Sequence, residues 1–301
     1  MISVVIPHYK NKARLYANLH HNLLFLKECE IIVVNDYPEE PLQKEMTQKF
    51  PTILVIENEK NLGFAGTVAV GIARANNPYI LLLNNDVLLR DDGFQKAVTY
   101  FDKDASLFAV SFRQIEKNGL FVGRNRIYWE GGFFQHSQAD ATKNGINGWA
   151  EGGSMLFDKK KYERINGFDV LYSPFYWEDI DLSYRAWKAG YTILFDLNIT
   201  VQHHHETTIA NNFSASQIKT IAYRNQFITI WKNISDGKMI YSHVIQLMKN
   251  LVLYPFRTEN EFIVGFWMAF LLIPQIMKKK GQQKKLWIKS DKEIFEKFKI
   301  I

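Results

Sequence analysis

The segment LLLNNDVLL (residues 81–89) interrupts a run of leucines with three polar residues, Asn84, Asn85 and Asp86. A buried strand does not tolerate an unpaired carboxylate, because an isolated charge inside a protein costs several kcal/mol or takes up a proton. We therefore expect one of two arrangements. Either the strand ends here and Asp86 lies in solvent, or a cation accompanies Asp86 in the folded protein.

This segment belongs to the last of four apolar segments that alternate with stretches of helical length. The apolar segments are rich in Ile, Val and Leu, and they begin at Ser3, Glu30, Thr52 and Pro78. The helical stretches cover about residues 11–27, 39–50 and 64–76. Alternating strands and helices predict an α/β fold, in which helices flank a mostly parallel sheet. Continuous apolar strands are typical of such a sheet.

Polar residues follow each apolar segment. In open α/β sheets, ligands bind beyond the carboxyl ends of the strands. The residues expected at that edge are Pro7-His8-Tyr9, Asn35-Asp36, Glu57-Asn58 and Asn84-Asn85-Asp86. Asp86 is therefore predicted to lie at a ligand-binding edge of the sheet.

From about residue 105 the sequence is mixed and rich in aromatic residues. WAEGGSMLFD, which starts at Trp149, predicts a further strand, and a later strand ends in ITVQHHHE. After about residue 214 the pattern is helical to the end. We therefore divide the chain into an α/β region at residues 1–213 and a helical, basic region at residues 214–301.

The net charge of +6 comes entirely from the C-terminal end, because residues 278–301 contain nine lysines and three acidic residues. A basic face for nucleic acid would be spread over the fold, so we expect no nucleic-acid partner. The single cysteine, Cys29, excludes an intrachain disulfide, and the N-terminal MISVVIP has the pattern of a strand rather than of a signal peptide. Both features favour a cytoplasmic protein.

Two glycines, Gly63 and Gly66, open a helix in NLGFAGTVAVGIA, which begins at Asn61. Glycine lets a ligand approach the backbone closely, and a helix N-terminus favours an anion. The segment has neither the Gly-Lys-Ser/Thr of a P-loop nor the G-x-G-x-x-G of a dinucleotide site. A simple glycine-containing turn remains the alternative.

The acidic residues at other positions also have either a functional or a purely structural interpretation. Asp36, which ends the second strand, can accept the imide N–H of uracil or thymine, or it is a loop acid or helix cap. Glu178, Asp179 and Asp181 precede a helix beside Trp177. They suit a general base next to a sugar-stacking aromatic ring, or they simply stabilise the helix N-terminus.

Three consecutive histidines, His203, His204 and His205, end the last strand. In an extended segment His203 and His205 share one face and His204 points away. Imidazole is a common ligand for divalent transition metals. We expect at least one of these histidines to contact a metal ion, with His203 and His205 as candidates.

Taken in order, PHYKN, VVNDYPEE, NLGFAGTVAVGI, LLLNNDV, a Gly-Gly strand, INGFD and WEDIDLSYR resemble the inverting glycosyltransferases of family 2, which have the GT-A fold. The resemblance covers about residues 1–210 and is nearest to bacterial enzymes that add rhamnose or related sugars to lipid-linked precursors of surface polysaccharides. It implies a nucleotide-sugar half at about residues 1–105 and an acceptor half at about 106–213.

The resemblance also implies roles for individual residues. Asp179 would be the catalytic base, with Glu178 beside it, and Asp86 would hold a divalent cation, Mg²⁺ or Mn²⁺, together with His203. The residues expected around the nucleotide sugar are Pro7, Tyr9, Asp36, Asn61, Gly63, Gly66, Asn85 and Asp86. The residues expected around the acceptor or its sugar are Gly152, Gly153 and Trp177.

Three positions depart from the family pattern. The usual Asp-Asp-Gly-Ser after the second strand is replaced by Asn35-Asp36-Tyr37-Pro38, and the first acid of the Asp-x-Asp motif is Asn84. Ala69 stands two residues before Gly71, where the family usually has Asn. One carboxylate, one histidine and the donor phosphates still suffice for Mg²⁺ or Mn²⁺.

The expected activity is transfer of a sugar, with inversion, from a UDP- or dTDP-type donor to a hydroxyl of a glycan or lipid-linked glycan. The alternatives are a non-catalytic scaffold that binds nucleotide sugars and a sugar nucleotidyltransferase. Residues 262–277 carry no charge, contain Pro274 and are followed by lysines. This segment is shorter than the roughly 20 residues of a spanning helix, so we expect peripheral binding to the inner face of the plasma membrane. A core helix or a dimer contact is the alternative.

Overall fold

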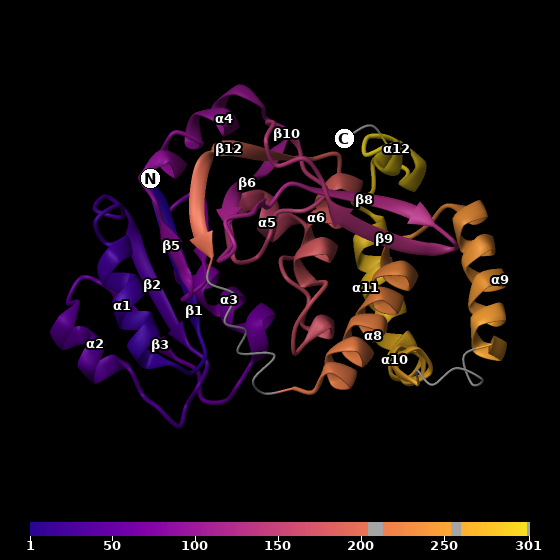
Figure 1. The fold of residues 1–301 in the computed structure, drawn as a ribbon, viewed down its shortest axis with the longest axis horizontal. Coiled ribbons are helices and arrows are strands. Elements are labelled where there is room, and N and C mark those ends of the chain that lie inside the picture. Colours follow the sequence, from indigo (N-terminus) through magenta and orange to yellow (C-terminus); the bar gives the residue numbers. More distant parts are fainter. Residues whose placement is uncertain (204–212, 254–259, 300–301) are drawn as a thin grey trace.

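The computed structural model describes residues 1–203, 213–253 and 260–299. In these residues, ten strands form one sheet whose central order is β10-β12-β6-β11-β4-β1-β2-β3 (Figure 1). The ten strands are β1 (Ile2–His8), β2 (Glu30–Asn35), β3 (Leu54–Glu57), β4 (Tyr79–Leu83), β5 (Val87–Leu89), β6 (Leu107–Ile115), β7 (Phe121–Val122), β10 (Gly145–Ile146), β11 (Ser154–Asp158) and β12 (Thr192–His203). The predicted α/β fold with a mostly parallel sheet is confirmed.

The first four predicted strands are β1 to β4, and they pair in parallel in the order β3-β2-β1-β4. The predicted helices between them are α1 (Lys12–Asn22), α2 (Gln43–Lys49) and α3 (Gly63–Arg74). α3 packs against β1 and β2, where a Cβ atom added to Gly71 would lie 2.5 Å from Val5 Cγ1. Glycine is therefore needed at position 71 for this close approach of helix and sheet.

The sheet continues into the second half of the chain through β11, which runs antiparallel between β4 and β6. β12 runs parallel to β6 and its C-terminal end pairs antiparallel with β5. The helices of this half are α4 (Val98–Lys103), α5 (Lys159–Arg164) and α6 (Glu178–Lys188), and a separate hairpin is formed by β8 (Asn125–Glu130) and β9 (Phe133–Gln138).

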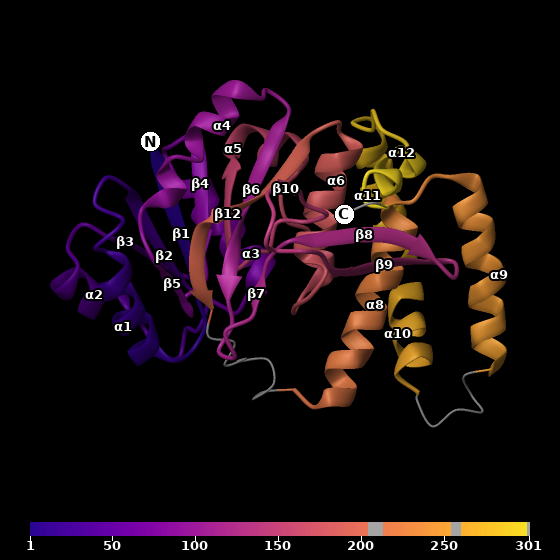
Figure 2. The same cartoon turned by 45° about the horizontal axis from the view of Figure 1, so that its top comes forward.

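Beyond the sheet, the C-terminal region forms a layer of helices at the opposite end of the molecule from β3 (Figures 1 and 2). Its helices are α8 (Ala215–Asn233), α9 (Gly237–Leu253), α10 (Glu261–Phe270), α11 (Ile273–Lys284) and α12 (Asp291–Glu296). One buried cluster contains residues from both sides of position 213, among them Tyr184, Phe227 and Phe295. The division into regions 1–213 and 214–301 stays a prediction.

Several elements differ from their predicted extent: α1 ends at Asn22 and not near residue 27, and α2 covers only Gln43–Lys49 of the predicted 39–50. The segment that starts at Trp149 becomes a strand only at Ser154, after the two glycines 152 and 153. The uncharged segment 262–277 divides into α10 and α11, which are bent by 66°. Within the described part of the chain, each helix alone is too short or too polar to cross a membrane, although this bent pair has a sufficient combined length and apolar content.

Candidate active site

The carboxyl ends of β1 and β4 lie side by side, and His8 contacts Asn85 there. Asn85 Nδ2 lies 2.9 Å from His8 Nδ1, and burial lowers the pKa of His8 to about 4. The imidazole is therefore neutral at physiological pH, so its Nδ1 accepts the amide hydrogen. Asn18 Nδ2 in α1 donates to the Asn85 carbonyl at 2.8 Å. The protein itself holds Asn85 in place, and a contact with the donor stays a prediction.

Asp86 and His203 meet because β12 returns to the end of β4. His203 is paired with Val87 in the β5–β12 ladder, one residue after Asp86. Asp86 Oδ1 lies 3.3 Å from His203 Nε2, and both side chains are largely buried. An oxygen and an imidazole nitrogen at this spacing fit a divalent cation that takes further oxygens from water or phosphate. The sequence predicted both residues, and the structure brings them together.

Buried atoms without hydrogen-bond partners gather around this pair. Of the nine such side-chain atoms in the described residues, four are His8 Nε2, Asn84 Oδ1, Asp86 Oδ1 and Glu178 Oε2. Buried polar atoms are normally paired. The other five atoms belong to Tyr16, Arg124, Ser154, Asn233 and Trp287, so the four at the candidate site are open to a ligand without proving one.

The described residues contain no group of three His, Cys, Asp or Glu side chains arranged around a metal. A cation held by Asp86 and His203 would therefore need ligands from the donor, and one carboxylate with phosphate oxygens is a usual arrangement for Mg²⁺. His205, the other predicted ligand, lies outside the described residues.

Asp179 lies in the first turn of α6, and its carboxylate faces the loop of residues 151–153. Gly152 N donates to Asp179 Oδ2 at 3.2 Å, and the Ile180 N–H donates to Oδ1 at 2.8 Å. Burial raises the pKa of Asp179, the Gly152 hydrogen bond opposes this effect, and the charge of Glu151 adds to it. A carboxylate with a raised pKa is suited to accept a proton near neutral pH.

Glu178 differs from its neighbour Asp179 because no hydrogen bond from the described residues reaches its Oε2. Burial raises the pKa of Glu178, and the charge of Asp179 raises it further. Two adjacent carboxyls that repel each other cannot both ionise easily. Asp179 is the one with a donor already in place, so it is the better candidate for the base.

Asp181 has a different environment although it stands only two residues away. It is fully buried and forms ion pairs with Arg185 and Lys232, each at 2.8 Å. Burial alone would raise the pKa of Asp181, but these two cations bring it well below its usual range. Asp181 therefore supports the fold and is not available as a base.

Gly152 and Gly153 connect the two sets of site residues. A Cβ atom added to Gly152 would lie 3.7 Å from Asp179 Cβ, and one added to Gly153 would lie 3.2 Å from His203 Cε1. Asn84 N also donates to the Gly153 carbonyl at 2.9 Å. Consecutive residues thus contact the candidate base and the candidate cation ligands, and a side chain at position 153 would crowd His203.

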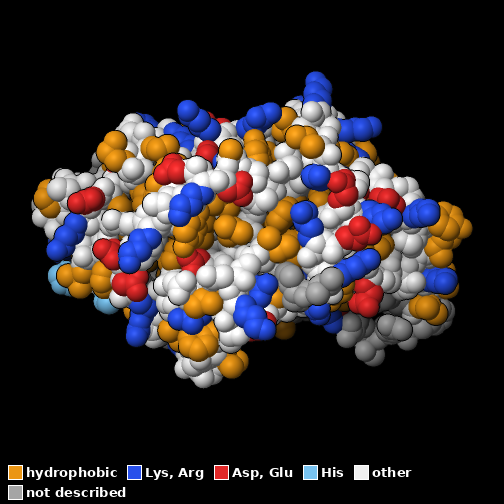
Figure 3. All heavy atoms as spheres, turned by 90° about the horizontal axis from the view of Figure 1, so that it is seen from above, with side chains coloured by type: hydrophobic (Ala, Val, Ile, Leu, Met, Phe, Trp, Pro, Cys, Tyr) orange, Lys and Arg blue, Asp and Glu red, His pale blue; other side chains and the backbone are white. Residues whose placement is uncertain are grey.

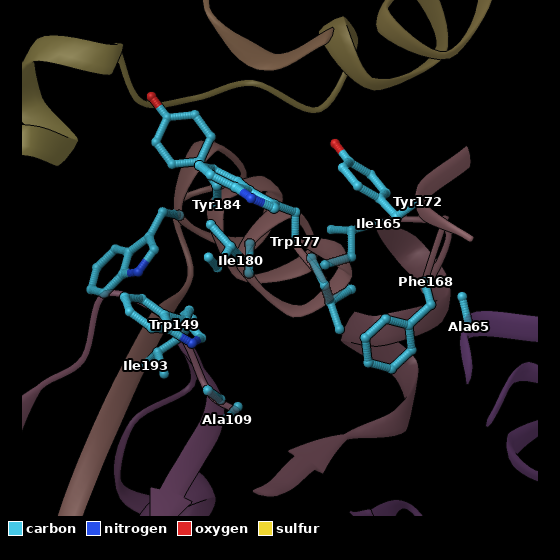
Figure 4. Packing of buried hydrophobic residues seen from close by; sticks show 14 of the residues in the cluster. Ala65, Ala109, Trp149, Ile165, Phe168, Tyr172, Trp177, Ile180, Tyr184 and Ile193 are labelled. Carbon is cyan, nitrogen blue, oxygen red and sulfur yellow. The ribbon is translucent and has the colours of Figure 1, made fainter. Parts of the chain in front are cut away.

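Trp177 is a core residue in this structure. Its side chain is 7% exposed, and its ring centroid lies 5.1 Å from that of His136 and 5.8 Å from that of Phe134. Figure 4 shows it within the packed cluster that also contains Ile180 and Tyr184. The predicted stacking of Trp177 on a sugar stays a prediction, and this burial speaks against it. The adjacent Tyr176 is 39% exposed.

The predicted nucleotide residues lie at the ends of β1 and β2 and at the start of α3. Asp36 Oδ1 accepts hydrogen bonds from Asn58 Nδ2 and Leu62 N, both at 2.8 Å. Asp36 thereby joins the end of β2 to the loop that precedes Gly63.

Two aromatic rings lie just after β1 and β2. The ring centroids of Tyr9 and Tyr37 are 5.5 Å apart, and Lys10 Nζ lies about 5 Å from each centroid. Pro7 is half-buried just before Tyr9, and Asn61 Oδ1 accepts from Gly63 N at 2.8 Å. The φ angle of Gly63 is +68°, which favours glycine. Gly66 lies in the first turn of α3, where an added Cβ would lie 2.8 Å from Leu62 Cβ. Aromatic rings beside an ammonium group are compatible with a nucleotide.

Sequence reasoning missed the residues that position this site. Asn225 in α8 has its Nδ2 within 3.0 Å of the carbonyl oxygens of Tyr172, Phe175 and Tyr176, so it holds the loop that leads into α6. Asn58, which binds Asp36, was visible at the end of its strand, but its role was not. Asn225 stands in a helix far along the chain, and no local signal marks it.

The chain matches the family model described as glycosyl transferase family 2 over residues 3–165, which is more than half of its length. A second model, described as the N-terminal domain of galactosyltransferase, matches residues 136–208. The chain is 24% identical over 227 residues to the O-antigen chain rhamnosyltransferase RfbN of Salmonella typhimurium, covering 70% of this chain and 69% of that protein. It is 27% identical over 108 residues to an uncharacterized glycosyltransferase of Haemophilus influenzae, 36% of either chain.

Solved structures share the fold at low sequence identity. GalNAc-T7 with UDP, GalNAc and Mn²⁺ has a TM-score of 0.62 at 14% identity, over 91% of this chain and 57% of that one. The mannosyltransferase PcManGT from Pyrobaculum calidifontis, in complex with GDP-Man and Mn²⁺, has a TM-score of 0.54 at 13% identity, over 95% and 84%. The GT-A fold implied by the sequence is confirmed. With more than half of its length matched by the family model, the chain belongs to glycosyl transferase family 2.

Proposed function

We propose that the protein transfers a hexosyl or rhamnosyl group, with inversion, from a UDP- or dTDP-sugar to a hydroxyl of a glycan or lipid-linked glycan. The observation that carries this proposal is the placement of Asp179 next to the Asp86–His203 pair, with only Gly152 and Gly153 between them. Mn²⁺ in the two structures of similar fold supports a divalent cation, Mg²⁺ or Mn²⁺, at that pair.

Each group of residues has a defined task in this reaction. Asp86 Oδ1 and His203 Nε2 would hold the cation, which when bound stabilises the charge that develops on the leaving diphosphate. Asp36 would bind the base of the nucleotide. Asp179 would take the proton of the acceptor hydroxyl while the oxygen of that hydroxyl bonds to the anomeric carbon on the face opposite the diphosphate. The diphosphate leaves with the electrons of the broken C–O bond, and the configuration inverts.

A thermal-shift panel of nucleotide sugars with and without Mn²⁺ tests the binding half of the proposal. A ligand present at 100 times its dissociation constant adds about 2.7 kcal/mol to the free energy of unfolding. We expect a UDP- or dTDP-sugar to raise the midpoint only with the cation, and Asp86→Ala to lose both this shift and turnover. Full activity of the wild type in EDTA would contradict the proposal.

Product analysis separates the remaining alternatives. A glycosyltransferase releases a nucleoside diphosphate and forms a product of inverted configuration, which NMR of the new glycosidic bond reveals. A sugar nucleotidyltransferase would release pyrophosphate instead. A non-catalytic scaffold would bind the donor and release neither product.

The C-terminal helices support binding to an anionic membrane from the cytoplasmic side. α9 exposes three large apolar side chains, Tyr241, Met248 and Val252, each of which is more than half exposed. α10 and the bend after it expose Trp267 and Leu271. Figure 3 shows apolar side chains at the end of the molecule where α9 lies, with lysines nearby. A lipid-linked acceptor lies in a membrane, and an enzyme that acts on it would use an exposed apolar surface to bind that membrane.

Charge favours a membrane over a second copy of the chain. The described residues of α9, α10 and α11 contain six lysines and one acidic residue, Glu261; Lys279 pairs with Asp169 and Lys280 donates to two backbone carbonyls, which leaves four lysines for a surface. Each lysine near an anionic surface adds about 1 kcal/mol to membrane binding. Truncation before α10 would remove Phe262 and Phe266 from the core, so surface variants are the better test.

Met248→Glu combined with Leu271→Glu should abolish sedimentation with anionic liposomes at low salt, while the midpoint of thermal unfolding stays at the wild-type value. Leu54→Glu, at an exposed apolar position in β3 at the opposite end of the molecule, is the matched control. If the wild-type protein does not bind such liposomes, the membrane proposal is wrong. If the wild type is a dimer and a variant of α9 is a monomer, this surface is a dimer contact.

A further inference from the structure

Gln114 lies in β6, is fully buried and touches His203 from the side opposite Asp86. Gln114 Oε1 lies 2.8 Å from His203 Nδ1, while Asp86 Oδ1 lies near the other ring nitrogen, Nε2. The amide group of Gln114 also contacts the carboxylate of Glu151 through Nε2. Glu151 Oε1 accepts from Asn125 Nδ2 at 2.9 Å.

The orientation of this chain of hydrogen bonds is determined at its Glu151 end. A carboxylate only accepts, so the amide nitrogen of Gln114 must face Glu151 and its oxygen must face His203. An amide oxygen also only accepts, so His203 Nδ1 must carry the hydrogen. In a neutral imidazole the other nitrogen then has the lone pair. Nε2, which faces Asp86, is therefore ready to bind a cation.

We propose that Gln114 is a positioning residue: held by Glu151, it fixes the tautomer and ring orientation of His203 so that Nε2 faces the cation bound with Asp86. The proposal rests on the proposed function, since it assumes that a divalent cation binds this pair. Histidines that ligate metals generally donate their second N–H to a neighbouring acceptor, and loss of that acceptor weakens metal binding by about 10- to 100-fold. Here the acceptor is an amide whose direction a carboxylate imposes.

Gln114→Met tests this assignment, because methionine has a similar volume and no amide. We expect the Mn²⁺ dissociation constant, measured in the presence of UDP from the electron paramagnetic resonance of free Mn²⁺, to rise about 10-fold or more. In the metal-free Asp86→Ala background, where no Asp86 carboxylate faces Nε2, ¹⁵N NMR of the imidazoles should show His203 changing from the pure Nδ1–H tautomer to a mixture when Gln114→Met is added. The His203 signal is assigned by its loss in His203→Ala.

A double-mutant cycle separates positioning from a general structural effect. In the His203→Ala background, Gln114→Met should produce no further loss of Mn²⁺ affinity. The matched control is Gln202→Met, since the Gln202 amide contacts Arg90 instead. If Gln114→Met does not fold, Glu151→Gln replaces it, because an amide at 151 lets Gln114 turn and should mix the His203 tautomers in the same spectrum.

The outcomes are distinguishable. If Asp86→Ala leaves Mn²⁺ affinity unchanged, the proposed function fails together with this inference. If Asp86→Ala weakens Mn²⁺ binding but Gln114→Met keeps both the wild-type affinity and the pure tautomer, Gln114 is a core residue and only the present proposal is overturned.

Discussion

Two clusters of charged residues meet at the start of α6, and they differ in how completely their atoms are paired. The ion network around Asp181 consists of Asp169, Asp181, Arg185 and Lys232, whose charged atoms are all paired; in the adjoining Asn233 only Oδ1 lacks a hydrogen-bond partner in the described residues. Asp181 accepts hydrogen bonds from Tyr172 Oη at 2.9 Å and from Asn233 Nδ2 at 2.7 Å, in addition to its two ion pairs. Lys232 also pairs with Asp169 at 2.8 Å.

The site cluster, Asn84, Asp86, Glu178, Asp179 and His203, is also rich in acidic side chains but contains no lysine or arginine, and it leaves oxygens of Asn84, Asp86 and Glu178 without hydrogen-bond partners in the described residues. A buried charge without a partner destabilises a fold, so it persists where a ligand completes it. In this protein, paired charges stabilise the structure, and the unpaired ones lie where we propose that the chemistry takes place. Asp179 and Asp181 belong to different clusters although they are two residues apart.

The largest expected effect concerns stability and tests the ion network. Asp181→Asn removes the charge that two buried cations require, and breaking a buried pair in this way typically costs about 3–5 kcal/mol. We expect the free energy of unfolding in urea to fall by that amount. The fraction that remains folded should bind donor with wild-type affinity. A variant as stable as the wild type would show that Asp169 alone compensates Lys232 and Arg185.

The next effect concerns the candidate base. Asp179→Asn keeps the shape of the side chain and removes its ability to accept a proton, so kcat should fall by about 10²-fold or more. Donor affinity should stay close to the wild-type value, and the unfolding midpoint at neutral pH should not fall, because the raised pKa of Asp179 makes its ionisation destabilising. Equal turnover at saturating substrate would move the role of base to Glu178.

The pH dependence of the wild type follows from the same carboxyl. Because the pKa of Asp179 is raised, the base becomes protonated, and kcat declines, at a higher pH than an ordinary aspartate with a pKa of about 3.9 would allow. The acid limb of the kcat–pH profile should therefore lie above that value. An acid limb at or below it would contradict this environment for Asp179.

A smaller effect is expected for the histidine of the site cluster. His203→Ala leaves Asp86 and the donor phosphates as ligands, so the Mn²⁺ concentration that gives half-maximal activity should rise about 10-fold, the order of a lost metal contact. His205→Ala is the comparison variant. If His205→Ala has the damaging effect and His203→Ala is silent, the ligand within the histidine triplet is the other one.

The smallest effect concerns Glu178 and is one of stability. The pKa of Glu178 is raised in the folded protein, so its folding contribution is fully present at pH values below the unfolded pKa and is lost as pH rises towards the folded pKa. Glu178→Gln has no carboxyl to ionise, so it avoids this loss of stability at high pH. The variant should melt higher than the wild type at pH 8 and show a smaller gain at pH 4, with a shift on the order of 2 °C per kcal/mol.

A pH-independent difference between Glu178→Gln and the wild type would show that the carboxyl of Glu178 is not in the unsatisfied environment described here. Asp181→Asn provides the contrast, because the pKa of Asp181 is lowered and its stabilising contribution is present above the unfolded pKa and lost only as pH falls through its lowered folded value. The two variants should therefore change stability in opposite directions at neutral pH.

The sequence by itself determined the alternation of strands and helices and the end of β4 just before Asn84, and it predicted the acids and the histidine of the candidate site. These features depend on neighbours along the chain, since periodicity, strand ends and helix starts are local properties. The order of the short motifs along the chain also indicated the family. Local pattern could not separate Asp179 from Asp181, which share one helix turn.

The tertiary structure decided which polar atoms are paired, because their partners come from distant parts of the chain. Lys232 in α8 neutralises Asp181, Asn225 holds the loop before α6, and Gln114 in β6 orients His203. It also buried Trp177 and divided residues 262–277 between two helices. Hydrogen bonding and desolvation depend on what surrounds a side chain in three dimensions, and only packing of the whole chain sets those surroundings.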